Sequence, residues 1–250
     1  YMKFTIDRAR FLKVLNTVSI AIVPKSPTPA YLNFKIDMLD DRLQVTGCNG
    51  ELTITSFCPI KENDKNLITD YEVGSTLISA KFLLDIIRSI DSDSVSIEIV
   101  DNVIARISNN KYQSKLNSIP ASEYPDLDLK KQGSSIVVPA DDLKKIISQT
   151  AFAASTKEGR PVLTAINAFA DGKTINFIAT DSYRLSKKTY ELNQEFSILA
   201  NIPVKTLNEV SKLIDGGDIE INISRNKVVF EYKETTIYSR LIAGDFPKTS

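Results

Sequence analysis

Basic side chains recur at matching positions on two stretches that the apolar pattern predicts to be helices. Lys81 and Arg88 project about 140–160° away from the apolar stripe of the first stretch, at roughly 100° per residue. Lys205 and Lys212 fall at the same angles in the second stretch. A polar outer face is common on any amphipathic helix, so one such helix alone would indicate little.

Two further expected helices carry a cation in the same way. Lys13 and Lys145 stand opposite the apolar stripes of those helices. Ammonium groups on an outer helix face contact phosphates without reading bases. The pattern therefore indicates loose, sequence-independent and salt-sensitive contact with a nucleic-acid duplex.

The chain as a whole carries no excess of positive charge. Its 250 residues include 31 Lys and Arg and 31 Asp and Glu, so the formal net charge is zero. This balance argues against a simple basic nucleic-acid binder. The compensating acids must lie elsewhere, as in Asp37–Asp41 and Asp91–Asp93, so we expect the charge to be segregated.

Composition excludes most catalytic and metal chemistry. The sequence has no His, the commonest metal ligand and the side chain best suited to proton transfer near neutral pH. Cys48 and Cys58 form no CxxC pair, and we expect reduced thiols on strands of an intracellular protein. No Gly-rich phosphate loop or metal-ligand spacing is present. We therefore expect no metal, no cofactor and no catalytic residue.

Membrane and secretion signals are not found in the sequence. No run approaches the roughly 18 apolar residues of a membrane span, and the N-terminus lacks a signal-peptide pattern. We expect a cytoplasmic protein. Two other classes stay open at this point: an enzyme using Asp181, Ser182, Tyr183 or Arg184, and a β-rich adhesion or scaffold module.

An internal repeat organises the chain. The i, i+3, i+4, i+7 spacing of a helix with one buried face occurs in two pairs of corresponding stretches. The first pair is Phe11, Val14, Leu15, Val18 and Leu143, Ile146, Ile147, Thr150; the second pair is Leu83, Ile86, Ile87, Ile90 and Leu207, Val210, Ser211, Ile214.

Strand patterns repeat between these helices. The alternating run 95–99 corresponds to 219–223, and each copy closes on an aromatic-proline pair, Tyr124-Pro125 and Phe246-Pro247. Each unit thus predicts a strand, a helix, several strands, a second helix and further strands, which is an α+β fold with two helices on a largely antiparallel sheet. We expect domain one over 1–126, a polar linker over 127–134 and domain two over 135–250.

Four stretches in order make the chain resemble the bacterial sliding clamp family, the beta subunit of DNA polymerase III. They are residues 2–6 (MKFTI), 120–127 (PASEYPDL), 158–163 (EGRPVL) and above all 179–185 (ATDSYRL). The resemblance implies tandem DNA-clamp domains and a non-enzymatic processivity factor. Such a clamp is a ring of two subunits joined head to tail, with helices lining a hole around duplex DNA and sheets outside.

The resemblance also assigns roles to basic residues. Lys25 matches a basic residue in the loop after the first helix, and Lys81 and Lys205 match second-helix cations that touch the DNA backbone. Lys157 and Arg160 lie on another DNA-facing loop, where Pro161-Val162 replaces two Tyr of some relatives. The expected DNA-contacting residues are Lys13, Lys25, Lys81, Arg88, Lys145, Lys157, Arg160, Lys205 and Lys212.

The family further offers a pocket for short linear peptides carrying apolar side chains and a glutamine. The replicative DNA polymerase, the clamp loader and repair factors share it. An apolar floor with a few polar edges suits such a ligand, and Tyr183 replaces a His common in relatives. The matching positions are Leu163, Thr180, Ser182, Tyr183, Arg184, Leu185 and Pro247.

The family's chains continue into a third copy of the unit. The resemblance therefore implies that this sequence is a piece holding domains one and two, with half of the peptide pocket and without the ring interface. We expect the full-length protein to form the head-to-tail homodimer and this fragment not to form rings. The alternative is that 250 residues are the whole protein, a two-domain clamp of the archaeal and eukaryotic type that forms a trimeric ring.

Overall fold

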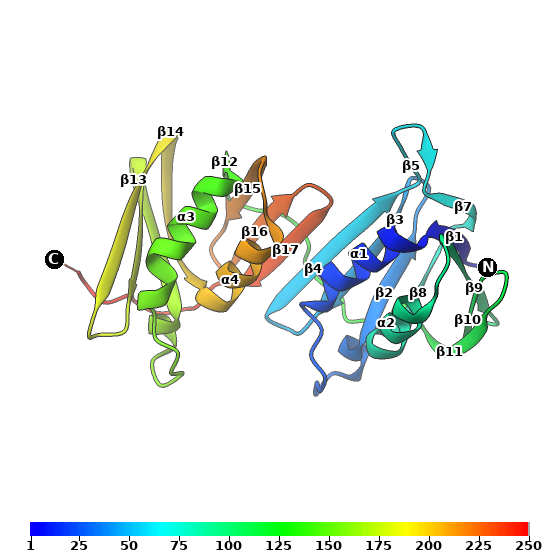
Figure 1. Cartoon of the computed structure of the whole chain (residues 1–250). Coiled ribbons are helices and arrows are strands. Elements are labelled where there is room, and N and C mark those ends of the chain that lie inside the picture. The colour runs from blue at the N-terminus through cyan, green and yellow to red at the C-terminus, as the bar shows by residue number, and fades with distance from the viewer. Residues whose placement is uncertain (250) are drawn as a thin grey trace. The chain divides into compact units, whose positions relative to one another are not determined.

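The computed structural model describes residues 1–249 and divides into two compact units (Figure 1). Unit 1 covers Tyr1–Asp128 and unit 2 begins at Leu129. Each unit has the order strand, helix, strands, helix, strands. The predicted α+β fold with two helices per repeat is confirmed.

Unit 1 contains helices α1 (Arg8–Ser19) and α2 (Ala80–Ser89) and an antiparallel sheet. Its strands are ordered β4-β3-β2-β8-β11-β10-β9-β1-β7. The short strands β5 (Lys61–Glu62) and β6 (Lys65–Asn66) pair with each other. The strand bounds are β1 Lys3–Asp7, β2 Asn33–Met38, β3 Arg42–Cys48, β4 Leu52–Pro59, β7 Ile68–Glu72, β8 Gly74–Ser79, β9 Ser94–Val100, β10 Ile104–Ser108 and β11 Gln113–Pro120.

Unit 2 contains helices α3 (Ala140–Thr150) and α4 (Val204–Leu213). Four of its strands are ordered β12-β15-β16-β17, and the long strands β13 (Ala165–Thr180) and β14 (Leu185–Pro203) pair with each other. That pairing has two ladders: 165–172 runs against 196–203, and 174–180 runs against 185–191. The remaining bounds are β12 Ser134–Pro139, β15 Asp218–Ile223, β16 Lys227–Tyr232 and β17 Thr235–Arg240.

The helices begin where local chemistry supports a first turn. Asp7 caps α1 by accepting a hydrogen bond of 3.0 Å from the Arg10 amide, and Ser79 caps α2 through the Phe82 amide at 3.3 Å. Helices α3 and α4 instead follow Pro139 and Pro203 without a side-chain cap. Acidic residues in the first turn of α3, Asp141 and Asp142, complement its dipole.

The buried faces of α1 and α3 are those that the spacing predicts. Every member of the stripes beginning at Phe11 and at Leu143 is buried. In α2 the buried stripe begins one turn earlier, at Ala80, and includes Leu84. The predicted Ile86 is only half-buried, because Ala80, Leu83, Leu84 and Ile87 satisfy the same helical spacing with a shifted start.

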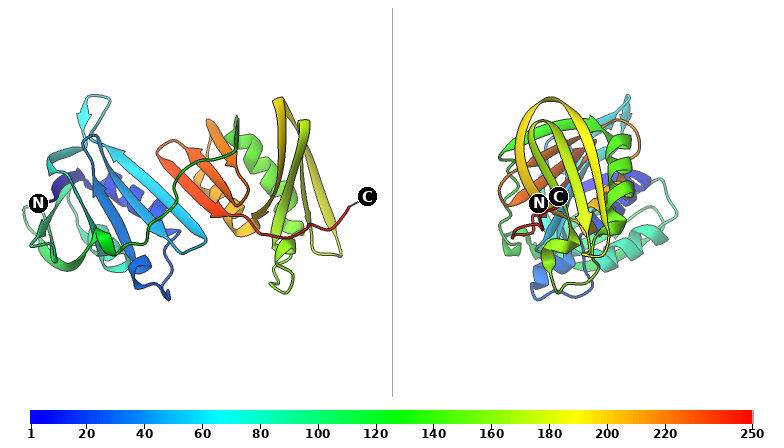
Figure 2. Two further views of the ribbon diagram at one scale, coloured as in Figure 1. Left: turned by 180° about the vertical axis from the view of Figure 1, so that it is seen from behind. Right: turned by 90° about the vertical axis from the view of Figure 1, so that its left-hand side faces the viewer.

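After β17 the chain of unit 2 leaves regular structure. Figure 2 shows this segment, 241–249, in dark red, running across β13 and β14. Backbone bonds hold its start: the Leu241 amide donates to Asn226 O at 2.9 Å and the Ile242 amide to Asn201 O at 2.9 Å. The aromatic-proline pair Phe246-Pro247 therefore lies within a segment fixed against the sheet of unit 2.

Both cysteines are buried thiols outside any disulfide, Cys48 at the end of β3 and Cys58 in β4. Within residues 1–249, no helix is long and apolar enough to cross a membrane. The same residues contain no group of three or more His, Cys, Asp or Glu side chains placed to hold a metal ion.

Candidate nucleic-acid interface and peptide site

The two helices of each unit pack against each other. Helix α1 contacts α2 in unit 1, and α3 contacts α4 in unit 2 (Figure 1). One of these contacts is polar, since Arg88 Nη2 donates to Asn16 Oδ1 at 3.0 Å. The outward cations of each unit therefore stand on a pair of neighbouring helices.

All of the basic side chains predicted to contact DNA are exposed. Helix positions supply most of them, and the loops before and after supply the rest. They are Lys13, Lys81 and Arg88 on the helices of unit 1, Lys25 in its loop, Lys145, Lys205 and Lys212 on the helices of unit 2, and Lys157 and Arg160 in the loop before β13.

Lys205 and Lys212 each form a surface ion pair. Lys205 Nζ lies 3.7 Å from Glu158 Oε1, and Lys212 Nζ lies 3.4 Å from Glu209 Oε1. The side chains of the first pair are 92% and 86% exposed, so water screens the attraction strongly. Such pairs leave both lysines able to turn toward a phosphate.

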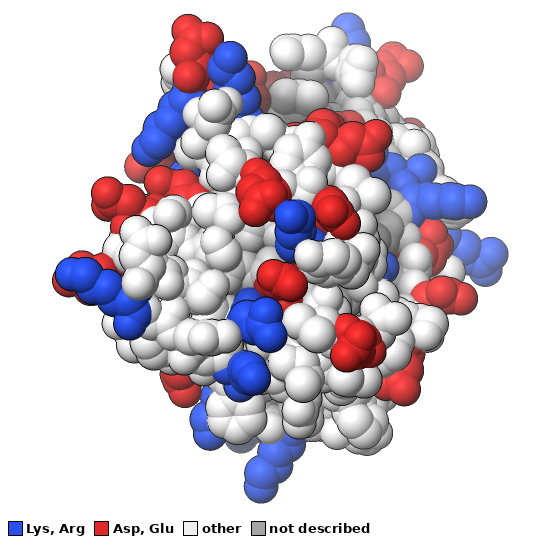
Figure 3. Space-filling model, turned by 90° about the vertical axis from the view of Figure 1, so that its right-hand side faces the viewer, with Lys and Arg blue, Asp and Glu red and all other residues white. Residues whose placement is uncertain are grey.

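Charge of both signs is interspersed on the face of the molecule drawn in Figure 3. Basic and acidic side chains alternate there among uncharged residues, and neither sign forms a continuous field. This face therefore offers no extended basic surface to a nucleic acid, and the helix pairs stay the better candidates.

The loop between β13 and β14 is a tightly hydrogen-bonded turn. Asp181 Oδ1 accepts from the amides of Tyr183 at 2.9 Å and Arg184 at 3.0 Å. These two bonds, together with the Arg184 guanidinium 3.3 Å away, lower the pKa of Asp181. Ser182 takes a left-handed backbone conformation with φ 79°. The turn thus holds Tyr183 and Arg184 in fixed positions.

Unit 1 has the same turn at the corresponding place. Asn49 Oδ1 accepts from the amides of Glu51 at 2.9 Å and Leu52 at 2.8 Å, and Gly50 has φ 95°. Cys48 accepts from the Gly50 amide as Thr180 accepts from the Ser182 amide. The repeat therefore extends to individual hydrogen bonds.

Exposed apolar side chains surround the turn in unit 2. Tyr183 is 97% exposed and Leu185 is 50% exposed, whereas Leu163 is buried beneath the surface. Phe152 is 58% exposed and was not identified from the sequence. Arg184 donates to Phe152 O at 2.7 Å, and its guanidinium carbon lies 5.6 Å from the ring centroid, so Phe152 fixes the arginine.

The polar members of the predicted pocket mostly serve the turn itself. Thr180 is buried, and its hydroxyl donates to Arg184 O at 2.6 Å. Arg160 Nη1 donates to Ser182 Oγ at 3.4 Å. Thr180 therefore shapes the loop and does not present a free polar edge, whereas Arg160 brings the predicted DNA-facing loop into contact with the predicted peptide site.

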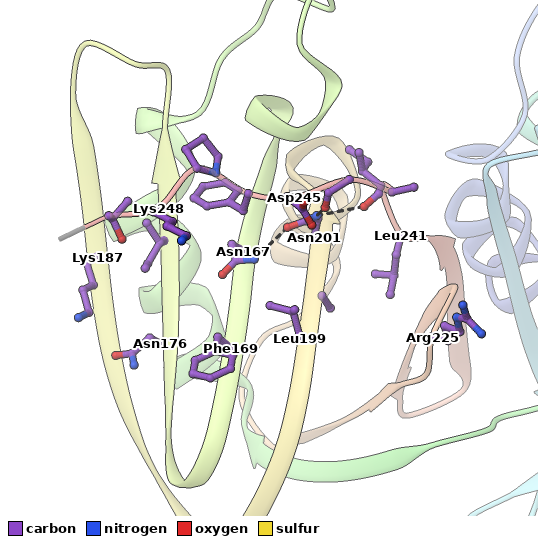
Figure 4. Close-up of a pocket in the computed structure, with 18 residues that line it drawn as sticks. Asn167, Phe169, Asn176, Lys187, Leu199, Asn201, Arg225, Leu241, Asp245 and Lys248 are labelled. Atoms are coloured by element: carbon purple, nitrogen blue, oxygen red, sulfur yellow. Dashed lines mark hydrogen bonds between the residues drawn. The ribbon is translucent and has the colours of Figure 1, made fainter.

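A groove of about 980 Å³ lies beside this site in unit 2 (Figure 4). Of the predicted pocket residues, Pro247 alone lines it. The other lining residues come from β13, β14, the segment 241–249 and Arg225 between β15 and β16, which the sequence patterns did not link. Asn201 connects these walls, because its Nδ2 donates to Ile242 O at 3.1 Å and to Gly244 O at 3.0 Å.

Duplicated α+β units with outward cations on paired helices are features of DNA-clamp proteins, and comparison with known families gives the same class. The DNA polymerase III beta subunit N-terminal domain matches residues 2–128, and the central domain of the same subunit matches residues 137–248. The chain belongs to the DNA polymerase III beta subunit family.

Curated relatives carry the name beta sliding clamp. The protein from Bacillus subtilis strain 168 is 34% identical over 253 residues, which are 100% of this chain and 67% of the relative. The protein from Halalkalibacterium halodurans is 32% identical over 254 residues, 99% of this chain and 67% of the relative. The chain thus spans about two thirds of the length of these relatives.

Solved structures agree with the sequences. The crystal structure of the DNA polymerase sliding clamp from Bacillus subtilis has a TM-score of 0.96 at 34% identity, covering 100% of this chain and 67% of that one. The DNA polymerase III beta chain from Streptococcus pneumoniae has a TM-score of 0.93 at 29% identity, covering 99% and 66%. These findings support the bacterial clamp rather than the two-domain archaeal or eukaryotic alternative.

Proposed function

We propose that this chain acts in a DNA polymerase processivity factor, a sliding clamp that encircles duplex DNA and tethers the replicative polymerase. The observation that carries the proposal is the pairing of helices in each repeat, with exposed lysines at corresponding positions such as Lys81 and Lys205. Long flexible ammonium groups hold a phosphate backbone without fixing its sequence, so DNA can slide. No cofactor or catalytic step is part of this function.

The assembly belongs to the same proposal. We infer a head-to-tail homodimeric ring for the full-length protein, in the cytoplasm and associated with the nucleoid. The relatives' names describe clamps, and a closed ring explains how weak backbone contacts keep a protein on DNA. Lys13, Lys25, Arg88, Lys145, Lys157, Arg160 and Lys212 complete the proposed DNA-facing set.

Partner peptides are proposed to bind at the turn of unit 2. Its exposed apolar residues Tyr183 and Leu185, with Arg184 held by Phe152, suit an apolar peptide with a polar anchor. The replicative polymerase, the clamp loader and repair factors are the proposed ligands. Leu163, Thr180, Ser182 and Pro247 would support the same pocket.

Unit 1 lacks this surface although its turn is the same. Glu51 stands where unit 2 has Tyr183, and the next residues, Leu52 and Thr53, are buried. Tyr124 is buried against Cys48 and Leu77. Its ring centroid lies 5.6 Å from that of Tyr31. The corresponding place in unit 1 is therefore filled by its own side chains, which supports one peptide site per pair of units.

Retention on DNA tests the clamp. The full-length protein, loaded by its clamp loader, should stay on nicked circular duplex DNA and leave the same DNA after linearisation. Equal loss from circular and linear DNA would contradict a topological clamp.

Substitutions at the turn test the peptide site separately. Leu185→Asp in the full-length protein should abolish binding of a polymerase-derived peptide, because a carboxylate replaces an apolar contact. Tyr183→Ala should weaken binding, whereas the matched Glu51→Ala in unit 1 should leave it unchanged. Equal peptide affinity of all three variants would exclude this site.

A further inference from the structure

The groove of unit 2 lies on the sheet face turned away from the helices. Tyr190 Oη donates to Asp142 Oδ2 at 2.6 Å, and Ser186 Oγ donates to Gln149 O, so these even-numbered positions of β14 face α3. Successive side chains of a strand point to opposite faces. Lys187, which lines the groove, therefore points away from α3.

The groove is continuous with the proposed peptide site. Ile178 and Lys187 line it, and Thr180 and Leu185 are two residues further along the same strands, hence on the same face. A peptide held at Leu185 could extend along β13 and β14 into the groove without leaving the surface.

The chemistry of the groove combines apolar and basic groups. Phe169 is 45% exposed and Leu199 is 70% exposed, so two large apolar side chains are open to a ligand. Lys187, Arg225 and Lys248 supply positive charge against the single acid Asp245 (Figure 4). None of these three cations forms an ion pair with another side chain of residues 1–249, so all three are available.

One wall of the groove is held in place before any ligand arrives. Asn201 donates to Ile242 O and Gly244 O through its amide nitrogen and accepts from Asn167 Nδ2 at 2.9 Å through its amide oxygen. Asn167 and Asn201 are both buried. A wall that is already ordered loses little entropy on binding.

We propose that this groove binds an extended acidic and apolar segment that flanks the pocket motif in partner proteins. The inference rests on the proposed function and adds a second contact region to the same peptide site. Charge complementarity selects acidic side chains for Lys187, Arg225 and Lys248, and Phe169 and Leu199 select apolar ones. Duplex DNA fits this groove less well, because the apolar side chains on its floor make no favourable contact with phosphates. The helices proposed to face DNA, α3 and α4, also pack against the other side of these strands.

Two peptides test the proposal by fluorescence anisotropy on the full-length protein. The first carries only the apolar and glutamine motif of the replicative polymerase; the second carries the motif with four added Asp, Glu, Leu and Phe residues, placed at either end in separate peptides. One of the extended peptides should bind about tenfold tighter than the motif alone at low salt. Equal affinity of all peptides would overturn the proposal.

Charge-reversal variants test whether the added affinity of the extended peptide arises in the groove. Lys187→Glu with Lys248→Glu should remove the tenfold gain while the motif peptide binds as before. Lys173→Glu, at an exposed lysine of β13 that does not line the groove, should keep the gain. A gain that survives in the double variant would refute the groove as its source. Loss of duplex DNA binding in that variant, with the gain kept, would mean a nucleic-acid contact instead. Failure of the motif peptide itself to bind wild type would reject the proposed function, not this extension alone.

Discussion

Arg8 Nε donates a hydrogen bond of 2.9 Å to the carbonyl oxygen of Ile87, in the last turn of α2. Arg8 Nη2 reaches Arg88 O as well, at 3.0 Å. The last carbonyls of a helix have no partner within it and carry partial negative charge, so a cation there is favourable. In unit 2 a different residue caps the end of the second helix, since Lys144 Nζ donates to Ile214 O at the end of α4 at 3.0 Å.

Removing this contact should destabilise unit 1. We expect Arg8→Ala to lower the free energy of unfolding by about 1–2 kcal/mol, because two hydrogen bonds from a charged donor are lost. Urea denaturation followed by circular dichroism measures the change. Lys81→Ala, at an exposed position of α2, is the matched control and should change stability by less than about 0.5 kcal/mol. Equal stability of both variants would show that the contact contributes nothing.

Lys131 neutralises two acids that stand opposite each other in unit 2. Glu220 and Glu231 are direct cross-strand partners on β15 and β16, and Lys131 Nζ lies 3.2 Å and 3.1 Å from their carboxylates. Like charges in this position repel. Lys131→Met should therefore lower stability by about 0.5–1 kcal/mol at neutral pH, a modest value because the groups are partly exposed.

The pH dependence has a defined sign. Hydrogen bonding with Glu231, and then with Lys131 and Ser135, lowers the pKa of Glu220. A carboxyl group whose pKa is lowered on folding stabilises the folded protein above the ordinary carboxyl pKa, and this contribution is lost as pH falls through the lowered pKa. The difference between wild type and Lys131→Met should thus shrink in acid, and Glu231→Gln should restore much of the stability of Lys131→Met. A difference that grows on acidification would contradict this account.

Asp181 should titrate below the usual range for an aspartate. Two backbone amide bonds and the nearby Arg184 stabilise its charged form and lower its pKa. The extra stability that the charged carboxylate gives the turn is therefore present above the ordinary pKa and is lost as pH falls through the lowered one. Carbon-detected NMR titration of the Asp181 carboxyl measures this directly. A midpoint at or above the ordinary value would show that the turn is not formed in solution.

The corresponding residue of unit 1, Asn49, suggests Asp181→Asn as a variant that separates the hydrogen bonds of the turn from the charge of Asp181. An amide oxygen accepts the two backbone bonds there, so Asp181→Asn should keep the turn but lose its pH dependence. Asp181→Ala should lose both. The amide chemical shifts of Tyr183 and Arg184 distinguish these outcomes, and identical shifts in the two variants would argue that the side chain does not organise the loop.

Helix cations should determine how DNA binding responds to salt. Each phosphate contact adds about 0.9 to the slope of log affinity against log salt concentration, so Lys81→Ala with Lys205→Ala should reduce the slope by about 2. Lys115→Ala, an exposed lysine on β11, should leave it unchanged. An unchanged slope in the double variant would remove these helices from the DNA interface.

Local sequence patterns predicted the helices of this protein well. The stripe from Phe11 to Val18 needs only the helical period, and every member is buried. The start of the stripe in α2 was misplaced, because Leu84 and Ile86 are both apolar and periodicity does not choose between them. Packing against the rest of unit 1 determines which of these two side chains is buried.

Long-range contacts explain what the sequence did not reveal. The groove depends on Asn201 holding Ile242 and Gly244, residues more than 40 positions away, by amide bonds that leave no periodic pattern. Phe152 was missed for a related reason: a single phenylalanine after a helix gives no sign that Arg184 will lie over its ring. The peptide site was found only through the motif at 179–185, and its contact residues remain predictions.

The burial of Cys48 and Cys58 gives this protein a reporter for one of its two halves. Both thiols lie in unit 1, and the sequence has no other cysteine. A thiol reagent can modify them only when unit 1 opens, so the rate of labelling follows the local opening of that unit whatever the state of unit 2. Labelling kinetics in urea, compared with the overall loss of secondary structure, would reveal whether the two repeats unfold together or one after the other.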